Sequence, residues 1–312
     1  MMRRLEELAI VETPLDQWGW SVDVDAEGRM IIESDVQIIE GPRETDDYHL
    51  CGVYHKAGVP FAVTEVGYTP YEGMEVYEAY TRKFSDVCCE VMRPGRGLVI
   101  AGGFCTYLPG IVGGIQRALG PGKKLGIVYL DGHADIETPE MTRSHIVAGM
   151  PVAAMLGLGL QGWRDAAGMT NIIPSEQFLL TDYHARSPQD DHNIRRAGLD
   201  IVDEEGFKDP KCWDAHVEEL AQKVDAIFLH IDVDIMASRY VPAFKFPLPE
   251  NGQTPETVMR NVKKVMETGK AAAVSVMDVC FSPNAEGSEI TYLNAMRVLG
   301  SCLESWRTVP EF

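Results

Sequence analysis

The chain of 312 residues has few basic residues and no long apolar segment. It carries 28 Lys and Arg against 47 Asp and Glu, for a formal net charge of −19 at pH 7. Because nucleic acids and anionic membranes attract cationic surfaces, this balance argues against both as partners. No segment approaches the roughly 20 apolar residues of a membrane span, and residues 1–14 lack the continuous apolar core of a signal peptide. We therefore expect a cytoplasmic protein.

Paired cysteine motifs are also absent. An odd number of scattered cysteines without a Cys-x-x-Cys pair, in a chain of this length and apparent location, is typical of reduced thiols that are mostly buried. Only Cys105, in a motif described below, invites another interpretation. The seven are Cys51, Cys88, Cys89, Cys105, Cys212, Cys280 and Cys302.

Predicted strands and helices alternate along the chain, which favours an α/β fold with a doubly wound parallel sheet. In such a sheet, ligands bind beyond the carboxyl ends of the strands. We expect one domain over residues 1–312, with 1–35 as an N-terminal extension that contains a small hairpin at 21–34. The predicted strands are 36–40, 97–101, 127–130, 226–231 and 271–279, and the predicted helices are 76–92, 109–119, 187–197, 213–223, 254–267 and 290–306.

Two short acidic segments each follow an apolar run that is predicted to be a buried strand. Side chains alternate along an extended chain, so the acidic groups of each segment share one side of it. Crowded carboxylates repel one another unless a cation neutralises them, and carboxylate with imidazole suits a divalent ion such as manganese. The alternative is a set of helix caps and loop carboxylates. The segments are Asp131-Gly132-His133-Ala134-Asp135 and Asp232-Val233-Asp234.

Two further motifs, Gly102-Gly103-Phe104-Cys105 and Val276-Met277-Asp278-Val279, stand before and after the acidic segments. Together the four motifs resemble the ureohydrolase family of arginases, agmatinases and formimidoylglutamases. The resemblance covers about residues 97–299 and implies a three-layer α/β/α sandwich with an eight-stranded parallel sheet. It also implies two manganese ions, hydrolysis at a guanidino or formimino carbon, and a homo-oligomer, either a trimer or a hexamer.

The same resemblance implies the metal ligands. Where the family has a histidine ligand this chain has Cys105, whose softer thiolate favours zinc or iron over manganese. The bridging ligands would be Asp131 and Asp232. The first ion would be held by Cys105, Asp131, Asp135 and Asp232, and the second by His133, Asp131, Asp232 and Asp234.

Substrate recognition departs further from the family pattern. Glu137 stands where arginases hold the substrate carboxylate with Asn, and Ser187 where an Asp reads the amino group. Asp278 replaces the glutamate that orients the guanidinium group. We therefore predict that Glu137, Ser187 and Asp278 bind a small guanidino or amidino substrate other than arginine. Glu137 could instead cap a helix or face solvent.

The proton-shuttling histidine of the arginases also needs a substitute, because Ala148 stands at its position. We predict His145 as the proton donor to the leaving amine. Asp278, the other predicted catalytic residue, would pair with the cationic nitrogens of the substrate and orient them. A solvated loop histidine is the alternative for His145. His230 should share a side of its strand with Asp232, either as an extra ligand, as a group that orients one, or as a satisfied structural histidine.

These features favour a metal-dependent hydrolase of a linear guanidine or amidine, with a modified or N-hydroxylated guanidino compound among the candidate substrates. One alternative is a degenerate relative that keeps the fold for binding or regulation, since family residues are lost at Cys105, Ala148 and Ala237-Ser238. Another is a single-zinc hydrolase of acyl amides related to deacetylases. The metal content per chain separates the three: two ions, almost none, or one.

Overall fold

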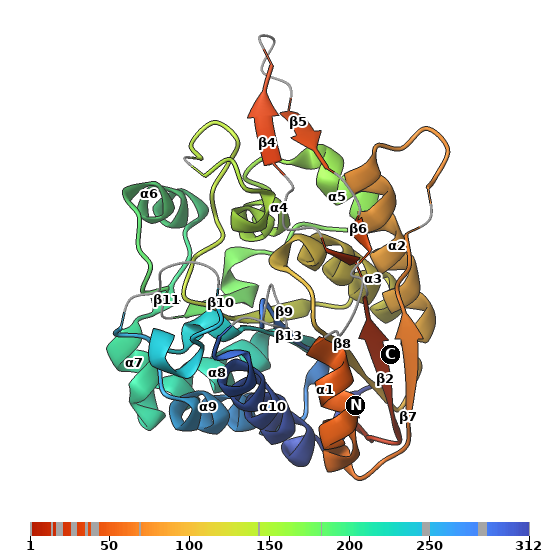
Figure 1. Ribbon diagram of the computed structural model, residues 1–312, viewed down its shortest axis with the longest axis vertical. Coiled ribbons are helices and arrows are strands. Elements are labelled where there is room, and N and C mark those ends of the chain that lie inside the picture. The colour runs from red at the N-terminus through yellow and green to blue at the C-terminus, as the bar shows by residue number, and fades with distance from the viewer. Residues whose placement is uncertain are drawn as a thin grey trace.

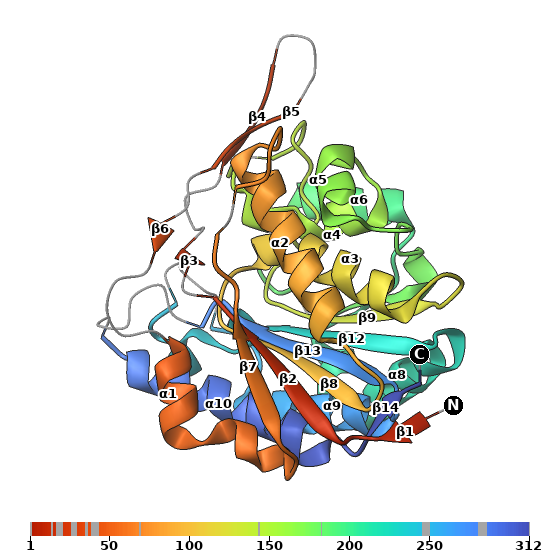
Figure 2. The same ribbon diagram turned by 90° about the vertical axis from the view of Figure 1, so that its right-hand side faces the viewer.

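A parallel sheet of eight strands runs through the middle of the computed structural model, with helices on both of its faces (Figure 1, Figure 2). This arrangement confirms the predicted three-layer α/β/α sandwich. The structure describes residues 2–13, 15–16, 21–25, 30–34, 37–38, 44–68, 70–142, 144–181, 183–244, 250–279 and 286–311.

All neighbouring strands of the central sheet pair in parallel. The strand order crosses over repeatedly, as expected for a doubly wound sheet. In spatial order the strands are β11 (Ile201–Val202), β10 (Phe178–Thr181), β9 (Leu125–Leu130), β12 (Ala226–Asp232), β13 (Ala271–Met277), β8 (Arg96–Ala101), β2 (Glu7–Glu12) and β7 (Phe61–Glu65).

Helices cover the two faces of the sheet as separate layers (Figure 2). One layer contains α2 (Val76–Val91), α3 (Leu108–Leu119), α4 (Pro151–Leu156), α5 (Gln161–Ala167) and α6 (Pro188–Ala197). The other contains α1 (Glu44–Cys51), α7 (Glu204–Lys208), α8 (Pro210–Lys223), α9 (Pro255–Glu267) and α10 (Ser288–Ser305). Short 3-10 turns are η1 (Val53–Ala57), η2 (Cys105–Tyr107), η3 (Val147–Gly149), η4 (Ser175–Gln177), η5 (Val233–Ile235) and η6 (Ser238–Tyr240).

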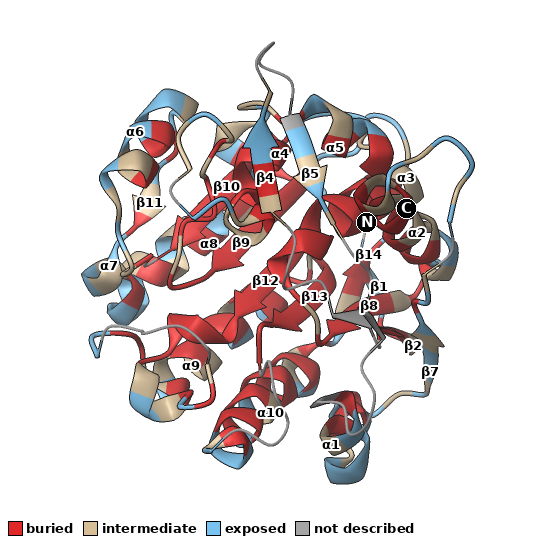
Figure 3. Cartoon of the chain, turned by 45° about the horizontal axis from the view of Figure 1, so that its top comes forward, coloured by how far each residue is buried: buried red, intermediate tan, exposed pale blue. Residues whose placement is uncertain are grey.

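The central strands are buried on both faces (Figure 3). In β12, Phe228 belongs to the core cluster under α2 to α6, whereas Leu229 and Ile231 belong to the cluster under α8 to α10. This alternation follows from the twofold repeat of an extended strand. His230 and Asp232 therefore face the same layer as Phe228.

Helix α3 lies unusually close to its neighbours because three of its residues have no side chain. A Cβ at Gly110 would lie 2.6 Å from the carbonyl oxygen of Thr81 in α2, and one at Gly114 would lie 2.6 Å from that of Ser85. A Cβ at Gly113 would collide with the Ala167 carbonyl of α5. The helix carries Pro in its first turn, where the missing amide proton costs least. The start of α3, which follows the turn η2 that contains Cys105, is thereby fixed against α2 and α5.

Most predicted elements are confirmed, but the N-terminal region differs. The described part of the predicted first strand at 36–40 is the strand β6 (Gln37–Ile38), but it pairs with β3 (Leu15–Asp16) and not with a strand of the central sheet. Residues 36, 39 and 40 lie outside the described residues. Instead β2 lies between β8 and β7. Residues 7–12 thus belong to the central sheet and not to an extension; the single domain stays a prediction.

Two further small sheets complete the chain. β4 (Ser21–Val24) and β5 (Met30–Glu33) form the predicted antiparallel hairpin, which projects from the rest of the protein (Figure 1). β1 (Met2–Arg4) pairs with β14 (Thr308–Pro310) and so joins the two ends of the chain. Among the described residues, no helix combines the length and apolar character needed to cross a membrane.

Candidate metal centre and substrate cavity

A cavity of about 230 Å³ lies beyond the carboxyl ends of β9, β12, β13 and β8, which are neighbours in the sheet. This is where a doubly wound sheet binds its ligands. Both acidic segments, Cys105 and Asp278 follow these strands, so four segments distant in sequence meet in one place. The described lining residues are Cys105, His133, Ala134, Asp135, Glu137, Ser144, Ile146, Ala148, Gly149, Asp190, Asp232, Asp234, Phe244 and Asp278.

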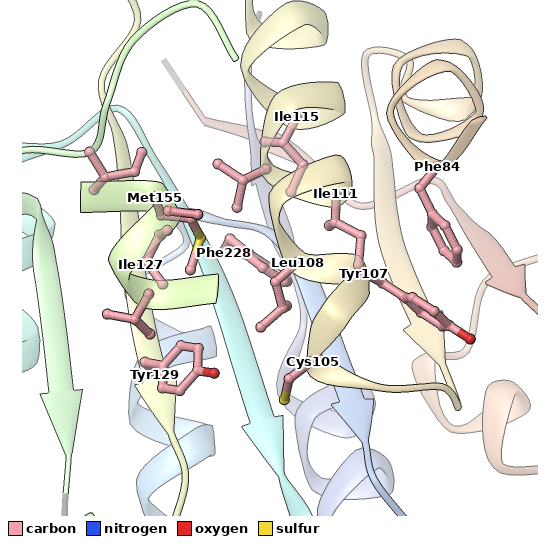
Figure 4. Packing of buried hydrophobic residues seen from close by; sticks show 14 of the residues in the cluster. Phe84, Cys105, Tyr107, Leu108, Ile111, Ile115, Ile127, Tyr129, Met155 and Phe228 are labelled. Carbon is pink, nitrogen blue, oxygen red and sulfur yellow. The ribbon is translucent and has the colours of Figure 1, made fainter. Parts of the chain in front are cut away.

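The turn after β8 places Cys105 in the cavity. Gly103 has a φ of 90°, which side chains rarely permit, and an added Cβ would collide with the ring of Tyr107. The chain then enters η2 and α3, whose Leu108 and Ile111 pack in the core. The sulfur of Cys105 points away from these two residues (Figure 4). A buried thiol thus ends the apolar cluster where the polar site begins.

Three carboxylates are oriented by backbone amides. The amide of His133 donates to Asp131 Oδ1 at 2.6 Å, that of Gly132 to Asp234 Oδ1 at 2.7 Å, and that of Asp234 to Asp232 Oδ1 at 2.8 Å. In each case one carboxylate oxygen is held and the other is left for a different partner. Such fixed carboxylates are ready to bind a cation without first being ordered.

Cys105 contacts three polar groups from two other strands. Its Sγ lies 3.2 Å from Asp278 Oδ2, 3.5 Å from Asp232 Oδ2 and 3.5 Å from His230 Nε2. The other ring nitrogen of His230, Nδ1, lies 2.9 Å from Ser275 Oγ on β13. All of these residues are buried.

The crowding of buried carboxylates changes their protonation. Burial and the charge of Asp234 raise the pKa of Asp131 and of Asp232 well above the ordinary value. Burial raises the pKa of Asp135 to about 7 and that of Asp278 to about 6. Without a cation nearby, these carboxyl groups therefore keep their protons to higher pH than ordinary carboxyl groups do.

Asp234 behaves in the opposite way. Burial alone would raise its pKa, but the charge and the hydrogen bond of His133 lower it to about 2. His133 Nδ1 lies 2.6 Å from Asp234 Oδ2. Although burial disfavours the imidazolium, Asp234 raises the pKa of His133 to about 9. In the absence of metal the two residues thus form an ion pair.

Three groups of side chains in the described part of the chain bring ligand atoms within 4.8 Å of one another. Asp131 Oδ2 is buried and has no hydrogen-bond partner. Burying a polar atom in this way costs free energy, which a bound cation would offset. Carboxylate, imidazole and thiolate donors are also the right chemical set for a divalent transition metal. The residues thus fit a metal centre. The groups are Cys105 with Asp131 and His230, Cys105 with Asp232 and Asp278, and Asp131 with His133 and Asp234.

Asp135 lines the cavity but belongs to none of these groups, which cover only the described residues. Its Oδ2 accepts a hydrogen bond of 2.7 Å from the hydroxyl of Tyr129. The tyrosine therefore occupies one oxygen of a carboxylate that the sequence predicted as a ligand.

His145 is not brought to the cavity. Its Nδ1 lies 3.2 Å from the Val22 carbonyl and 3.3 Å from Asp23 Oδ1, both on β4, although its neighbours Ser144 and Ile146 line the cavity. A positive φ of 53° accompanies this outward direction. The geometry gives no support to the prediction that His145 donates the catalytic proton.

The predicted substrate-binding residues differ in position. Glu137 lines the cavity and accepts hydrogen bonds from Thr142 at 2.5 Å and Ser144 at 3.1 Å. Ser187 is instead the N-cap of α6, and its hydroxyl donates to Asp190 Oδ2 at 2.6 Å. Asp190, which the sequence interpretation missed, is the one that lines the cavity. The sequence gives one indication of this role: Asp190 stands three residues after Ser187, where Ser187-Pro188 marks the start of a helix, a position whose side chain often bonds back to the cap.

Burial raises the pKa of Asp190, a hydrogen bond from Ser187 opposes this, and the charge of Glu137 raises it further. Glu137 and Asp190 are absent from the metal-capable groups. Their charge would therefore remain if bound ions neutralised the carboxylates at the strand ends.

Comparison with known proteins agrees with this arrangement. The model of the arginase family matches residues 17–304. The chain is 24% identical to an arginase of Entamoeba histolytica over 261 residues, which cover 78% of this chain and 80% of the relative. It is 25% identical to an arginase of Brevibacillus brevis over 179 residues, which cover 56% of this chain and only 58% of the relative.

Solved structures show the same fold. The crystal structure of the Entamoeba histolytica arginase in complex with L-ornithine has a TM-score of 0.77 at 21% identity, covering 96% of this chain and 98% of that one. The formimidoylglutamase of Bacillus subtilis has a TM-score of 0.68 at 12% identity, covering 96% and 87%.

Proposed function

The chain belongs to the arginase family, and we propose that it is a binuclear metal-dependent hydrolase of a C–N bond in a linear guanidine or amidine other than arginine. The observation that carries this proposal is the convergence of three metal-capable groups, supplied by four neighbouring strands, on one cavity. In this proposal Asp131 and Asp232 bridge the two ions, and His133 and Asp234 complete the second site.

Two bound divalent ions would lower the pKa of a bound water and so supply the nucleophile. The protein's own groups would bind and orient the substrate. Asp278 lines the cavity beside Cys105 and can accept hydrogen bonds from a cationic amidine, which fixes the plane of the reacting carbon. Glu137 and Asp190 lie among the lining residues and would attract the positive charge of the substrate.

The same two carboxylates argue against arginine as substrate. None of the described lining residues is Lys or Arg. The α-carboxylate of arginine would therefore meet the negative charge of Glu137, and that of Asp190 whenever Asp190 is ionised, without a cation among these residues to balance it. A guanidino or amidino compound without that carboxylate, or with a modified or N-hydroxylated guanidino group, avoids the repulsion.

The proton for the leaving amine needs a donor inside the cavity. Asp190 lines it, and its raised pKa keeps a fraction of the carboxyl protonated at higher pH than usual. We propose Asp190 for this role in place of His145, which faces β4.

The test is a screen of the metal-loaded protein against guanidino, amidino and formimino compounds, including N-hydroxylated ones, with release of urea, ammonia or formamide as the readout. Arginine serves as the reference compound. The metal content per chain is measured on the same samples. Two ions with turnover of a non-arginine compound support the proposal, whereas a chain that retains almost no metal and turns over nothing favours a degenerate binding protein.

A further inference from the structure

The surroundings of His230 differ from those of an ordinary core histidine. The residue is fully buried in β12, yet its ring does not lie only among apolar groups. One nitrogen, Nε2, is directed at Cys105 Sγ at 3.5 Å, and the other, Nδ1, at Ser275 Oγ at 2.9 Å. The ring of Tyr129 packs against it with a centroid distance of 4.5 Å.

Ser275 lies against Nδ1 of His230 and leaves Nε2 on the side of Cys105. The two residues are directly paired across β12 and β13. When the Ser275 hydroxyl accepts the proton of Nδ1, the lone pair of Nε2 points toward Cys105. Metal-binding histidines are commonly oriented in this way, by a partner at the nitrogen opposite the metal.

The separations match a shared metal ion. A thiolate and an imidazole bound to one tetrahedral ion, at about 2.3 and 2.0 Å, lie about 3.5 Å apart. The observed distance from Cys105 Sγ to His230 Nε2 is 3.5 Å, and that from Cys105 Sγ to Asp232 Oδ2 is also 3.5 Å. Asp131, whose Oδ2 has no hydrogen-bond partner, forms a metal-capable group of three with Cys105 and His230.

Asp135, by contrast, is tied to the Tyr129 hydroxyl and lies outside every metal-capable group of the described residues. We infer that the first metal ion is bound by Cys105 and His230 together with Asp131 and Asp232, and that Asp135 is not its ligand. This inference rests on the proposed binuclear function. The imidazole that the family pattern places at the position of Cys105 is supplied here from β12.

This ligand set makes the two sites chemically different. The first offers sulfur and nitrogen, which favour zinc or iron, whereas the second offers His133 with carboxylates, which suits manganese. The chain would therefore bind two different metals when both are supplied.

The decisive experiment needs no variant. Full-length apo protein, prepared without oxygen, is loaded with one equivalent of zinc, and X-ray absorption at the zinc edge counts the neighbouring atoms. We expect one sulfur and one imidazole on the same ion. A sulfur without imidazole, or an imidazole without sulfur, overturns the inference.

Variants then identify the residues. Cobalt(II) titration of the wild-type protein should give a near-ultraviolet thiolate-to-metal absorption band. His230→Gln should weaken the binding of that first cobalt ion by about 100-fold or more, and Ser275→Ala by about 10- to 100-fold. Asp135→Asn should leave the band and its affinity unchanged. His192→Gln, at an exposed histidine of α6, is the matched control.

The opposite pattern would reassign the site. If Asp135→Asn weakens the first ion and His230→Gln does not, Asp135 is the ligand and the inference is wrong. This failure differs from a failure of the proposed function, which is read from the metal content and the substrate screen of the wild-type protein and not from these two variants. Near-ultraviolet circular dichroism of each apo variant confirms that it is folded before it is titrated.

Discussion

Cys105 Sγ lies 3.2 Å from Asp278 Oδ2, and the amide of Cys105 donates to the same oxygen at 3.3 Å, although the two residues are 173 positions apart in sequence. The amide of Asp278 in turn donates to the Gly103 carbonyl at 2.9 Å. The turns after β8 and β13 therefore hold each other in position, so a substitution that shifts the backbone of one turn should also shift the other.

The bridging role of Asp131 and Asp232 predicts the strongest effect on metal content. Asp131→Asn and Asp232→Asn should each lose both ions, with affinities reduced on the order of 100-fold or more, because each carboxylate serves both sites. Metal analysis after gel filtration is the measurement. Asp200→Asn, at an exposed position after α6, removes the same charge and should keep both ions. An Asp232→Asn protein with two ions and normal turnover would contradict the assignment.

Cys105 should be protected by metal. A bound ion occupies the sulfur, so alkylation of Cys105 should be slower in the metal-loaded protein than after chelation. Peptide mapping after timed iodoacetamide treatment measures this. Cys51 is exposed and provides an internal reference that should react equally in both states. Equal labelling of Cys105 with and without chelator would mean that its thiol is only a packed core group.

Replacement of the same residue tests the preference between metals. Cys105→His should restore a site of nitrogen and oxygen donors and shift the preference from zinc toward manganese. Competition between the two ions at equal concentration, followed by metal analysis, gives the ratio. An unchanged ratio would show that Cys105 does not select the metal.

Glu137 is expected to exclude substrates that carry a carboxylate. Glu137→Gln removes the charge but keeps an oxygen for the hydrogen bonds from Thr142 and Ser144. The ratio of kcat/KM for arginine to that for the preferred substrate should rise about tenfold, equivalent to about 1.4 kcal/mol. Glu140→Gln, at an exposed position of the same loop, should leave the ratio unchanged.

The apo protein should become less stable as pH rises from about 6.5 to 9. Burial raises the pKa of Asp135 to about 7, and Asp234 raises that of His133 to about 9, so the folded state binds protons that the unfolded state has released. His230, whose pKa burial lowers to about 3, acts in the opposite direction, but its effect fades once the pH exceeds about 6.5, where an unfolded histidine loses its proton. Thermal unfolding with chelator should therefore show Tm falling across this range.

Metal should reverse this trend, since ligands must lose their protons to bind it. The Tm difference between the metal-loaded and the chelated protein should grow with pH over the same interval. A chelated protein whose Tm rises from pH 6.5 to 9 would contradict the assignment of these protons.

Gly103 should be sensitive to a single methyl group. Gly103→Ala meets both a positive φ of 90° and the Tyr107 ring. Gly122→Ala has a φ of 82° and open space. Both variants should cost about 1 to 3 kcal/mol from backbone strain, and only Gly103→Ala should also disturb Cys105. Denaturant unfolding together with cobalt absorption distinguishes the two effects.

The sequence predicted the centre of the sheet better than its edge. β9, β12, β13 and β8 are apolar runs that end in acidic or glycine motifs, and such runs are recognisable as buried strands. β7 has an exposed or half-exposed pattern throughout, and the apolar core of β2 is only four residues long and flanked by glutamates. Runs that are this short or this exposed lack the length or the alternation by which a strand is recognised in a sequence.

Within the site, the sequence indicated where the strands end, but not which side chains of the following loops turn into the cavity. Asp131 and Asp232 follow strands whose ends must meet in a parallel sheet, so their proximity could be predicted. His145 turns outward and Asp190 inward because of contacts with β4 and Ser187, which no spacing along the chain reveals. Tertiary contacts therefore decide which of several nearby polar residues enters the cavity.

The use of four separate strands also sets the order in which the site can be assembled during synthesis. Gly132 and Asp234, which are hydrogen-bonded, are 102 positions apart. At about 5 to 20 residues per second, a ribosome needs roughly 5 to 20 seconds to make the intervening chain. Until then the first acidic segment and Cys105 have no partners from β12 or β13. Metal capture is therefore a late event, which follows the completion of the sheet and cannot guide its early steps.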